Sequence, residues 1–348
     1  MAGLKKYGAW VDLGPKVEVE ETMVGIRVIC IPQAGMGAWA FHGWQAKVGP
    51  RIEIIPVELP GRNTRMMEAK PEDMHATVGE LVANLPLDKP YVIMGHSLGA
   101  WMAYESARLV LEKKLRAPLA LVVSGARAAH LASLSRDTDT RAPALGGLPS
   151  AAFWENFERR YGKNPDLQLD TVRRYVEPLL RADFRLLETY EPKVERLPIP
   201  IVACGARGDD RFTSDQLEAW REHTSSDAFD VQWFDVTPLP WSTPHRYLVE
   251  DPADFIAFLA AYCDELLPPI LPGPYVVVSK KGALVREGID LDSPQVAVLE
   301  SGKPCRVAEV RYPTGGSKPR ARVDHPVAGW LSPHLLAAAA NNNNNNNN

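Results

Sequence analysis

The chain has 348 residues, of which 45% are hydrophobic, and a formal net charge of −4 at pH 7. This length and composition predict one large α/β domain with a small additional module, and the charge excludes the strongly basic surface of a nucleic-acid-binding protein. No apolar run approaches the roughly 20 residues that cross a membrane, so no membrane span is expected.

Residues 1–22 contain lysines but neither an apolar core nor a cleavage site. We interpret them as an N-terminal extension rather than a signal peptide, and we expect a cytoplasmic protein. The four cysteines are scattered without C-x-x-C spacing. They predict reduced thiols, buried in core strands for Cys30 and Cys204, and no metal site.

Residues 95–99 carry the most informative motif, Gly-His-Ser-Leu-Gly, between the apolar run 90–94 and the helix-like run 100–105. G-x-S-x-G between a strand and a helix is typical of a nucleophile elbow, in which the glycines permit a sharp turn that exposes the serine, here Ser97. The amide of Leu98 then lies at a helix N-terminus, where it can bind an oxyanion. The alternative is a glycine-rich turn with a chance serine.

Residues 129–196 do not alternate strand and helix. A polar, Pro/Gly-rich loop at 133–149 precedes two predicted helices, at 150–161 and 169–187. We interpret this segment as a lid over an acyl channel, the alternative being a core-packing helical pair. Asp183 on the second helix is interpreted as structural. The residues expected to bind substrate are Met36, Phe153, Trp154, Phe157 and Phe184.

A serine nucleophile needs a base and an acid that orients the base, and in this fold the chain order is Ser, then Asp or Glu, then His. The predicted strand at 197–205 is followed by two candidate acids, Asp209 and Asp210. The predicted strand at 229–235 is followed by His245, which precedes a final helix. This order predicts His245 as the base.

The chain has eight histidines, and their positions remove the other seven. Four precede any suitable acid, and two lie near the C-terminus. His223 falls within a predicted helix and is interpreted as a solvated residue. The alternative for His245 is an ordinary surface histidine on a loop.

The C-terminal part of the chain predicts a separate small module. A proline-rich linker at 268–274 leads to residues 275–336, whose strand-like runs resemble a small SH3-like β-barrel. We expect either a docking module or a stabilising appendage, and the pattern does not distinguish them. Residues 337–348 are low-complexity and are excluded from the expected fold. The predicted strands lie at 275–279, 283–286, 295–299, 305–310 and 321–323.

Several short runs occur in the order in which one enzyme family carries them. L-P-G-R at 59–62 and L-R-A-D-F at 180–184 are the most specific, because most α/β-hydrolases lack them; further runs lie at 31–35, 121–125 and 219–224. Over roughly residues 24–265, the chain resembles the stand-alone type II thioesterases of polyketide and nonribosomal peptide assembly lines. These are similar to the medium-chain acyl thioesterase of fatty-acid synthesis.

The resemblance implies an α/β-hydrolase sandwich with a mostly parallel sheet over residues 23–267 and a helical lid at about 129–196. The family's acid stands eleven residues before the tryptophan of an A-W-R-x-H-T segment, here Trp220, which favours Asp209 over Asp210. The second amide of the oxyanion hole is implied to be that of Ala34.

The implied activity is hydrolysis of acyl groups from the phosphopantetheine thiol of an acyl or peptidyl carrier protein through an acyl-serine, with no cofactor. A monomer or weak dimer is expected. The alternatives are a carboxylesterase or acyltransferase with the same three residues, or a non-catalytic adaptor that acts through the C-terminal barrel.

The chain departs from the family pattern at three places. Gln33 stands where histidine or an aromatic residue is common, and Met36 replaces a second glycine, both beside the expected oxyanion loop. The loop at 235–244, before His245, is longer and richer in proline than in the family. We expect the longer loop to reshape the entrance to the site.

Overall fold

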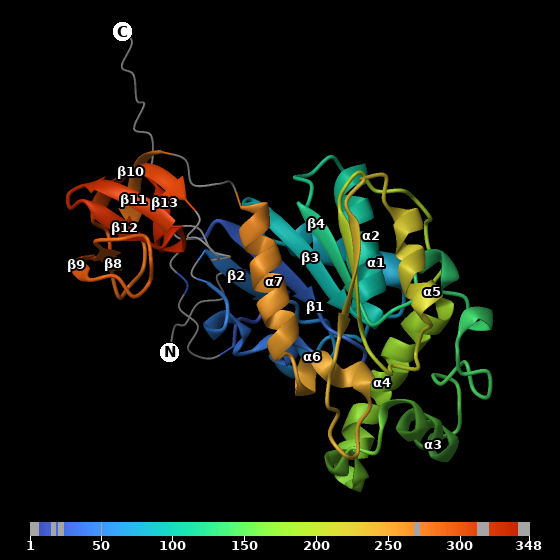
Figure 1. The fold of residues 1–348 in the computed structure, drawn as a ribbon. Coiled ribbons are helices and arrows are strands. Elements are labelled where there is room, and N and C mark those ends of the chain that lie inside the picture. The colour runs from blue at the N-terminus through green and yellow to red at the C-terminus, as the bar shows by residue number, and fades with distance from the viewer. Residues whose placement is uncertain are drawn as a thin grey trace. The chain divides into compact units, whose positions relative to one another are not determined.

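The computed structural model describes residues 7–14, 19, 24–49, 51–267, 272–311 and 320–339 (Figure 1). The chain divides into two compact units. The first consists of residues 1–17, 26–47 and 54–262, and the second of residues 18–25, 48–53 and 263–348. Most of the expected N-terminal extension and of the linker at 268–274 lies outside the described residues, so the expected domain boundaries stay predictions.

A parallel sheet forms the centre of the first unit (Figure 1), with six strands in the order β2-β1-β3-β4-β5-β6. The pairings of β1 with β3, β3 with β4, β4 with β5 and β5 with β6 are all parallel. Every residue of β1 to β5 is buried, as expected where both faces of a parallel sheet are covered. The strands are β1 (Ile26–Ile31), β2 (Ile52–Pro56), β3 (Tyr91–His96), β4 (Ala120–Ser124), β5 (Ile201–Ala206) and β6 (Phe229–Phe234).

Helices alternate with these strands, which confirms the predicted α/β fold class. Helix α2 packs against β3, which precedes it in the chain, and against the neighbouring strand β4. Short helix α6, absent from the sequence prediction, follows the loop that carries His245. The α-helices are α1 (Met74–Asn84), α2 (Leu98–Glu112), α3 (Ser150–Tyr161), α4 (Asp170–Thr189), α5 (Ser214–Glu218), α6 (Tyr247–Glu250) and α7 (Ala253–Leu266).

Helices α3 and α4 confirm the two helices predicted in the segment that interrupts the alternation (Figure 1). They bury a small core of their own between them, which includes Phe153, Phe157 and Phe184. The indole of Trp154 donates a hydrogen bond of 2.7 Å to Glu177 and so ties α3 to α4. The pair is therefore a small subdomain with its own hydrophobic centre.

The C-terminal strands form one antiparallel sheet in the order β13-β7-β10-β11-β12-β8-β9. Its core is apolar and includes Val277, Val285, Val307, Val323 and Leu331. No pairing joins β9 to β13 in the part of the chain that the structure describes, so closure into an SH3-like barrel stays a prediction. The strands are β7 (Gly273–Val277), β8 (Ala283–Arg286), β9 (Gln295–Leu299), β10 (Pro304–Arg311), β11 (Arg320–His325), β12 (Gly329–Leu331) and β13 (Leu336–Ala338).

Strand β13 corrects the expected start of the tail. Ala337 and Ala338, which the sequence analysis excluded from the fold, pair with Val276 and Tyr275 of β7. The hydrogen bonds that pair strands come from the backbone. A low-complexity alanine run can therefore extend a sheet, even though its side chains are small. The asparagines at 341–348 lie outside the described residues.

Two sequence predictions concern side-chain burial and membrane spans. The four cysteines are free and buried in the structure, and burial in core strands is as expected for Cys30 and Cys204. Burial raises the pKa of Cys204 well above its usual value, so this thiol stays protonated. In the described parts of the chain, we find no helix with the length and apolar character that crossing a membrane requires.

Candidate active site

Ser97 lies at the turn between β3 and α2 with φ 54° and ψ −116°, a conformation that is costly for a residue with a Cβ. The flanking glycines make the turn possible. A Cβ on Gly95 would lie 1.9 Å from the carbonyl oxygen of Gly99, and a Cβ on Gly99 would lie 2.2 Å from that of Ile31. The turn thus forces Ser97 out at the end of β3, as the elbow motif predicts.

His245 joins Ser97 to Asp209. Its Nε2 lies 3.1 Å from the Ser97 Oγ, and its Nδ1 lies 2.7 Å from the Asp209 Oδ2. The ionised Asp209 carboxylate accepts a hydrogen bond from the Nδ1–H of His245, which leaves Nε2 unprotonated and able to accept the proton of the Ser97 hydroxyl. Asp210 is exposed and does not contact His245; its carbonyl oxygen accepts a hydrogen bond from Thr138.

The Asp209 carboxyl is buried, yet it stays ionised. Burial by itself would raise its pKa, but the His245 ring and the backbone N–H of Arg211 hold the pKa below its usual range. An ionised, buried carboxylate fixes both the tautomer and the orientation of the ring it contacts.

His96 supports His245 from behind, a role that the sequence analysis missed. Its Nε2 lies 2.8 Å from the carbonyl oxygen of His245, which can only accept, so Nε2 carries the proton. Its Nδ1 then accepts from Ser124, whose hydroxyl lies 2.6 Å from that of Tyr247. Burial, together with the neighbouring His245 ring, lowers the pKa of His96 to about 3, so the ring is neutral. This network anchors the long loop at 235–244 where it reaches the site.

Leu98 begins α2 and Ala34 lies on the loop after β1, and their expected role as oxyanion amides stays a prediction. Leu98 is the first residue of α2, so its N–H has no partner within the helix. Ala34 follows β1 and, with Ser97, lines the same cavity. The next residue, Gly35, has a φ of 77° and donates its N–H to Asp183 at 2.7 Å.

Asp183 and Arg62 form a buried ion pair that holds this loop. The carboxylate accepts two hydrogen bonds, of 2.9 and 2.7 Å, from the Arg62 guanidinium, which also donates to the carbonyl oxygen of Met36 at 2.7 Å. Both side chains are almost fully buried. The L-P-G-R and L-R-A-D-F runs therefore meet in one bidentate contact, and Asp183 is structural, as predicted.

Two cavities open from Ser97 and His245. The larger, of about 180 Å³, is mainly apolar and is lined by Met36, Trp39, Leu180 and Phe184 among others. The smaller, of about 60 Å³, is lined by Arg127, Arg160 and Arg211. Nothing in the sequence analysis pointed to the arginines, because they come from three separate segments.

Comparison with known proteins places this geometry in a family. Residues 26–254 match the family described as "Thioesterase domain". The chain belongs to the thioesterase family. The match covers the parallel sheet, α3 and α4, and it ends before the C-terminal sheet.

Individual relatives agree with this assignment. The thioesterase is 32% identical to the gramicidin S biosynthesis protein GrsT of Aneurinibacillus migulanus over 70% of this chain and 91% of the relative. It is 33% identical to the medium-chain S-acyl fatty acid synthase thioesterase of Rattus norvegicus over 69% and 88%. The solved structure of RedJ, a thioesterase from the prodiginine biosynthetic pathway in Streptomyces coelicolor, covers 72% of this chain and 90% of its own, with a TM-score of 0.60 and 28% identity.

The structure of the thioesterase divides the residues expected to bind substrate. Met36, Phe157 and Phe184 line the larger cavity. Phe153 and Trp154 line neither of these two cavities and pack into the core between α3 and α4, and their expected contact with substrate stays a prediction. Helical periodicity marks an apolar face, but it does not distinguish a core from a cavity wall.

Proposed function

We propose that this thioesterase hydrolyses acyl thioesters through an acyl-serine intermediate on Ser97, with His245 as base and Asp209 as the orienting acid. The observation that carries the proposal is the continuous chain of hydrogen bonds from the Ser97 hydroxyl through the His245 ring to the Asp209 carboxylate. Such a chain activates a hydroxyl that is otherwise a weak nucleophile at neutral pH.

In the first half-reaction, the Ser97 Oγ attacks the thioester carbonyl carbon while His245 Nε2 takes the hydroxyl proton. The amides of Leu98 and Ala34 stabilise the negative charge on the carbonyl oxygen. The carbon–sulfur bond then breaks, and His245 returns the proton to the departing thiol. An ester between the acyl group and Ser97 remains.

In the second half-reaction, His245 removes a proton from a water molecule, which attacks the acyl-serine. The tetrahedral intermediate collapses, the proton passes to Ser97, and the free acid leaves. Helices α3 and α4, whose residues line both cavities, act as a lid that limits the access of bulk water. No step requires a cofactor.

We further propose that the substrate is an acyl group on the phosphopantetheine thiol of an acyl or peptidyl carrier protein. The relatives' names support this assignment, since they include a gramicidin S biosynthesis protein and a fatty acid synthase thioesterase. The larger cavity is apolar and suits an acyl chain.

The experiment compares one acyl group on three carriers, namely a carrier protein, coenzyme A and a short thiol, and measures kcat/KM by thiol release. Contacts with the carrier can be used to orient the reacting atoms, so we expect the carrier protein to give the highest value. Equal values would overturn the carrier-protein assignment. Transfer of the acyl group to an added alcohol or amine in preference to water would identify an acyltransferase instead.

A further inference from the structure

The smaller cavity beside Ser97 differs in character from the larger one. Both are lined by Ser97, His245, Tyr161 and Phe184, so they diverge at the reacting atoms. A thioester carbonyl carbon bound there carries two substituents, the acyl chain and the sulfur. Because the smaller cavity begins at Ser97, a group that lies only a few bonds from that carbonyl carbon can enter it.

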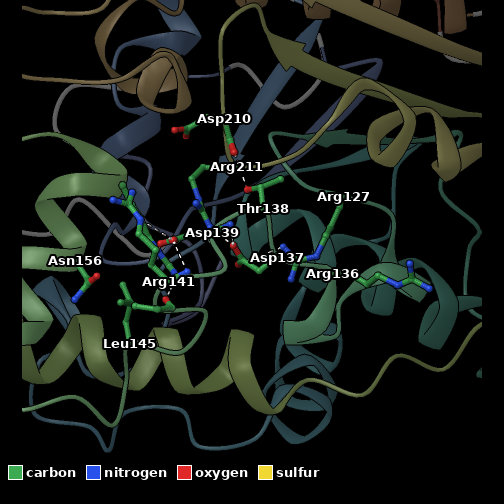
Figure 2. Close-up of polar contacts among 12 residues, drawn as sticks. Arg127, Arg136, Asp137, Thr138, Asp139, Arg141, Leu145, Asn156, Asp210 and Arg211 are labelled. Carbon is green, nitrogen blue, oxygen red and sulfur yellow. Dashed lines mark hydrogen bonds and ion pairs between the residues drawn. The ribbon is translucent and has the colours of Figure 1, made fainter.

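Three buried arginines line the smaller cavity: Arg127, Arg160 and Arg211, each less than 10% exposed. Figure 2 shows Asp137 between Arg127 and Arg211, whose guanidinium groups lie 3.6 and 2.7 Å from its carboxylate. One aspartate thus serves two arginines.

The other acidic groups near the cavity do not balance the positive charge of Arg127, Arg160 and Arg211. Asp139 forms ion pairs with three arginines, namely Arg159 at 2.5 Å, Arg160 at 2.6 Å and Arg141 at 3.8 Å. Glu188 also lines the cavity, but its carboxylate accepts hydrogen bonds from backbone N–H groups, including that of Gly146. The residues that line the cavity therefore include three guanidinium groups and two carboxylates, an excess of one positive charge among them. The ionised Asp209 carboxylate lies behind His245 and is hydrogen-bonded to its ring.

Arg211 has hydrogen-bond donors to spare. Its Nη2 donates to Asp137, whereas its Nε and Nη1 have no hydrogen-bond partner among the residues that the structure describes. Its guanidinium carbon lies 5.8 Å from the ring centroid of Tyr161, another residue of the cavity wall. A guanidinium with two nitrogens free to donate at a cavity wall is suited to a carboxylate.

The size of the cavity limits the ligand. A volume of about 60 Å³ has room for roughly four to six water-sized groups, which is a carboxylate with one to three methylenes. The phosphate of a pantetheine arm is excluded, because it lies at the far end of the arm from the thioester, whereas this cavity touches Ser97 itself.

We propose that this cavity binds the carboxylate of a short dicarboxylic acyl group, with Arg211 as its principal donor. The enzyme then favours a half-thioester such as succinyl over a neutral acyl group of the same length. This inference rests on the proposed function in one respect, which is that the acyl group reacts at Ser97.

The test measures binding, so that it does not depend on hydrolysis. The Ser97→Ala protein is titrated calorimetrically with acyl pantetheine analogues in which nitrogen replaces the thioester sulfur. We expect the succinyl analogue to bind about tenfold more tightly than the butyryl analogue, since a hydrogen bond to a charged group in a buried site contributes at least that much. Equal affinities would overturn the proposal, and so would equal affinities of the succinyl and 4-hydroxybutyryl analogues.

Substitutions of Arg211 test whether the preference for the succinyl analogue arises in this cavity. Arg211→Gln in the Ser97→Ala background is expected to reduce the succinyl preference to near unity, whereas Arg211→Lys is expected to retain part of it. The matched control is Arg207→Gln, because Arg207 lies on the same loop with 62% of its side chain exposed and lines neither cavity.

If Arg211→Gln does not fold, the Lys variant and the unsubstituted Ser97→Ala protein still decide the question. A preference that survives unchanged in a folded Arg211 variant would overturn the assignment to this cavity. Conversely, a succinyl preference in binding together with absent hydrolysis in the wild-type protein would overturn the proposed function and leave only the assignment of a carboxylate-binding cavity standing.

Discussion

The parallel-sheet unit and the C-terminal sheet bury very different side chains. Around Ser97, the first unit buries charged or polar groups from several segments, among them Arg62, Asp183, Asp209 and His96. In residues 272–311 and 320–339, the described part of the C-terminal sheet, Arg320 is the single buried charged side chain. It donates to the Ser332 hydroxyl and to the Trp330 carbonyl oxygen.

This difference indicates that the first unit buries charged groups at a cost in folding stability where they position the residues of the site. Burying a charge is costly unless it is paired, and replacement of a buried ion pair by apolar residues is often neutral or stabilising. The first unit nevertheless keeps such groups, and those at the site orient Ser97, His245 or the loop of Ala34. The C-terminal sheet has an ordinary apolar core, which suits a module without chemistry of its own.

Ser97→Ala should produce the largest effect on activity. We expect a loss of several orders of magnitude in kcat with an unchanged melting temperature, because the substitution removes the proposed nucleophile and only its hydrogen bond to His245. Thiol release and thermal unfolding measure the two quantities. Retention of more than about a tenth of the activity would show that Ser97 is not the nucleophile.

Asp209→Asn should be nearly as damaging, with a decrease of about a thousandfold or more in kcat, since an amide cannot hold the His245 tautomer. Asp210→Asn is the matched control, because Asp210 is adjacent and exposed and should leave kcat within about twofold. The opposite ranking of the two variants would move the acid by one position.

Asp183→Asn should have an intermediate effect, because Asp183 positions the loop of Ala34 and is not one of the proposed reacting groups. The substitution removes the charge that pairs with buried Arg62, so we expect a loss of about 3 kcal/mol of stability. The loop of Ala34 is expected to shift, which lowers kcat by on the order of tenfold to a hundredfold with a smaller change in KM. Asp170→Asn, an exposed position on the same helix, is the control. An unchanged kcat in a folded Asp183→Asn protein would show that the Arg62–Asp183 ion pair stabilises the fold but does not influence catalysis.

The lowered pKa of His96 in the folded protein leads us to expect that folding stability decreases at acidic pH. Its pKa is about 3 in the folded protein and about 6.5 in the unfolded chain, so below pH 6.5 the unfolded state binds the proton first. The stabilisation is complete above pH 6.5 and declines by about 1.4 kcal/mol per pH unit as the pH falls toward 3. Urea unfolding at pH 7.0, 6.0 and 5.0 measures this slope, and His96→Asn should make it shallower. The same slope in wild type and variant would assign the acid sensitivity to other groups.

Leu331→Ala in the C-terminal sheet should have the smallest effect on activity. Leu331 is fully buried, so the cavity should cost about 2–5 kcal/mol of stability in that sheet. Hydrolysis of a small soluble thioester should stay within about twofold of wild type, because every assigned reacting group precedes residue 268. Leu180→Ala, a similar truncation in the wall of the larger cavity, should lower kcat/KM. A large loss of activity in Leu331→Ala would show that the C-terminal sheet takes part in the site.

The order of elements and the elbow were predictable from local patterns. Apolar runs predicted the core strands, and Gly95 and Gly99 predicted a turn that only residues without a Cβ can form. The chain order of serine, acid and histidine selected Ser97 and His245 as candidates, and the resemblance favoured Asp209 over Asp210. These signals lie within a few residues of one another or follow a fixed order, so no knowledge of the packing is required.

The packing decided the rest. His223, predicted to be solvated, is buried, and its Nε2 lies 2.8 Å from the Nδ1 of His130, a residue 93 positions earlier. Phe153 and Phe157 lie on one helix, yet Phe157 lines a cavity and Phe153 packs into a core.

The sequence by itself determined the fold class, the elbow and the candidates for the reacting groups, because each depends on backbone geometry or on order along the chain. Only the tertiary structure decided what holds and surrounds them. Arg62 and Asp183, 121 positions apart, meet in one ion pair, and Arg127, Arg160 and Arg211 gather from three segments around one cavity. Charges so far apart in sequence leave no periodic pattern, and their energy depends on burial and distance, which exist only once the chain has folded.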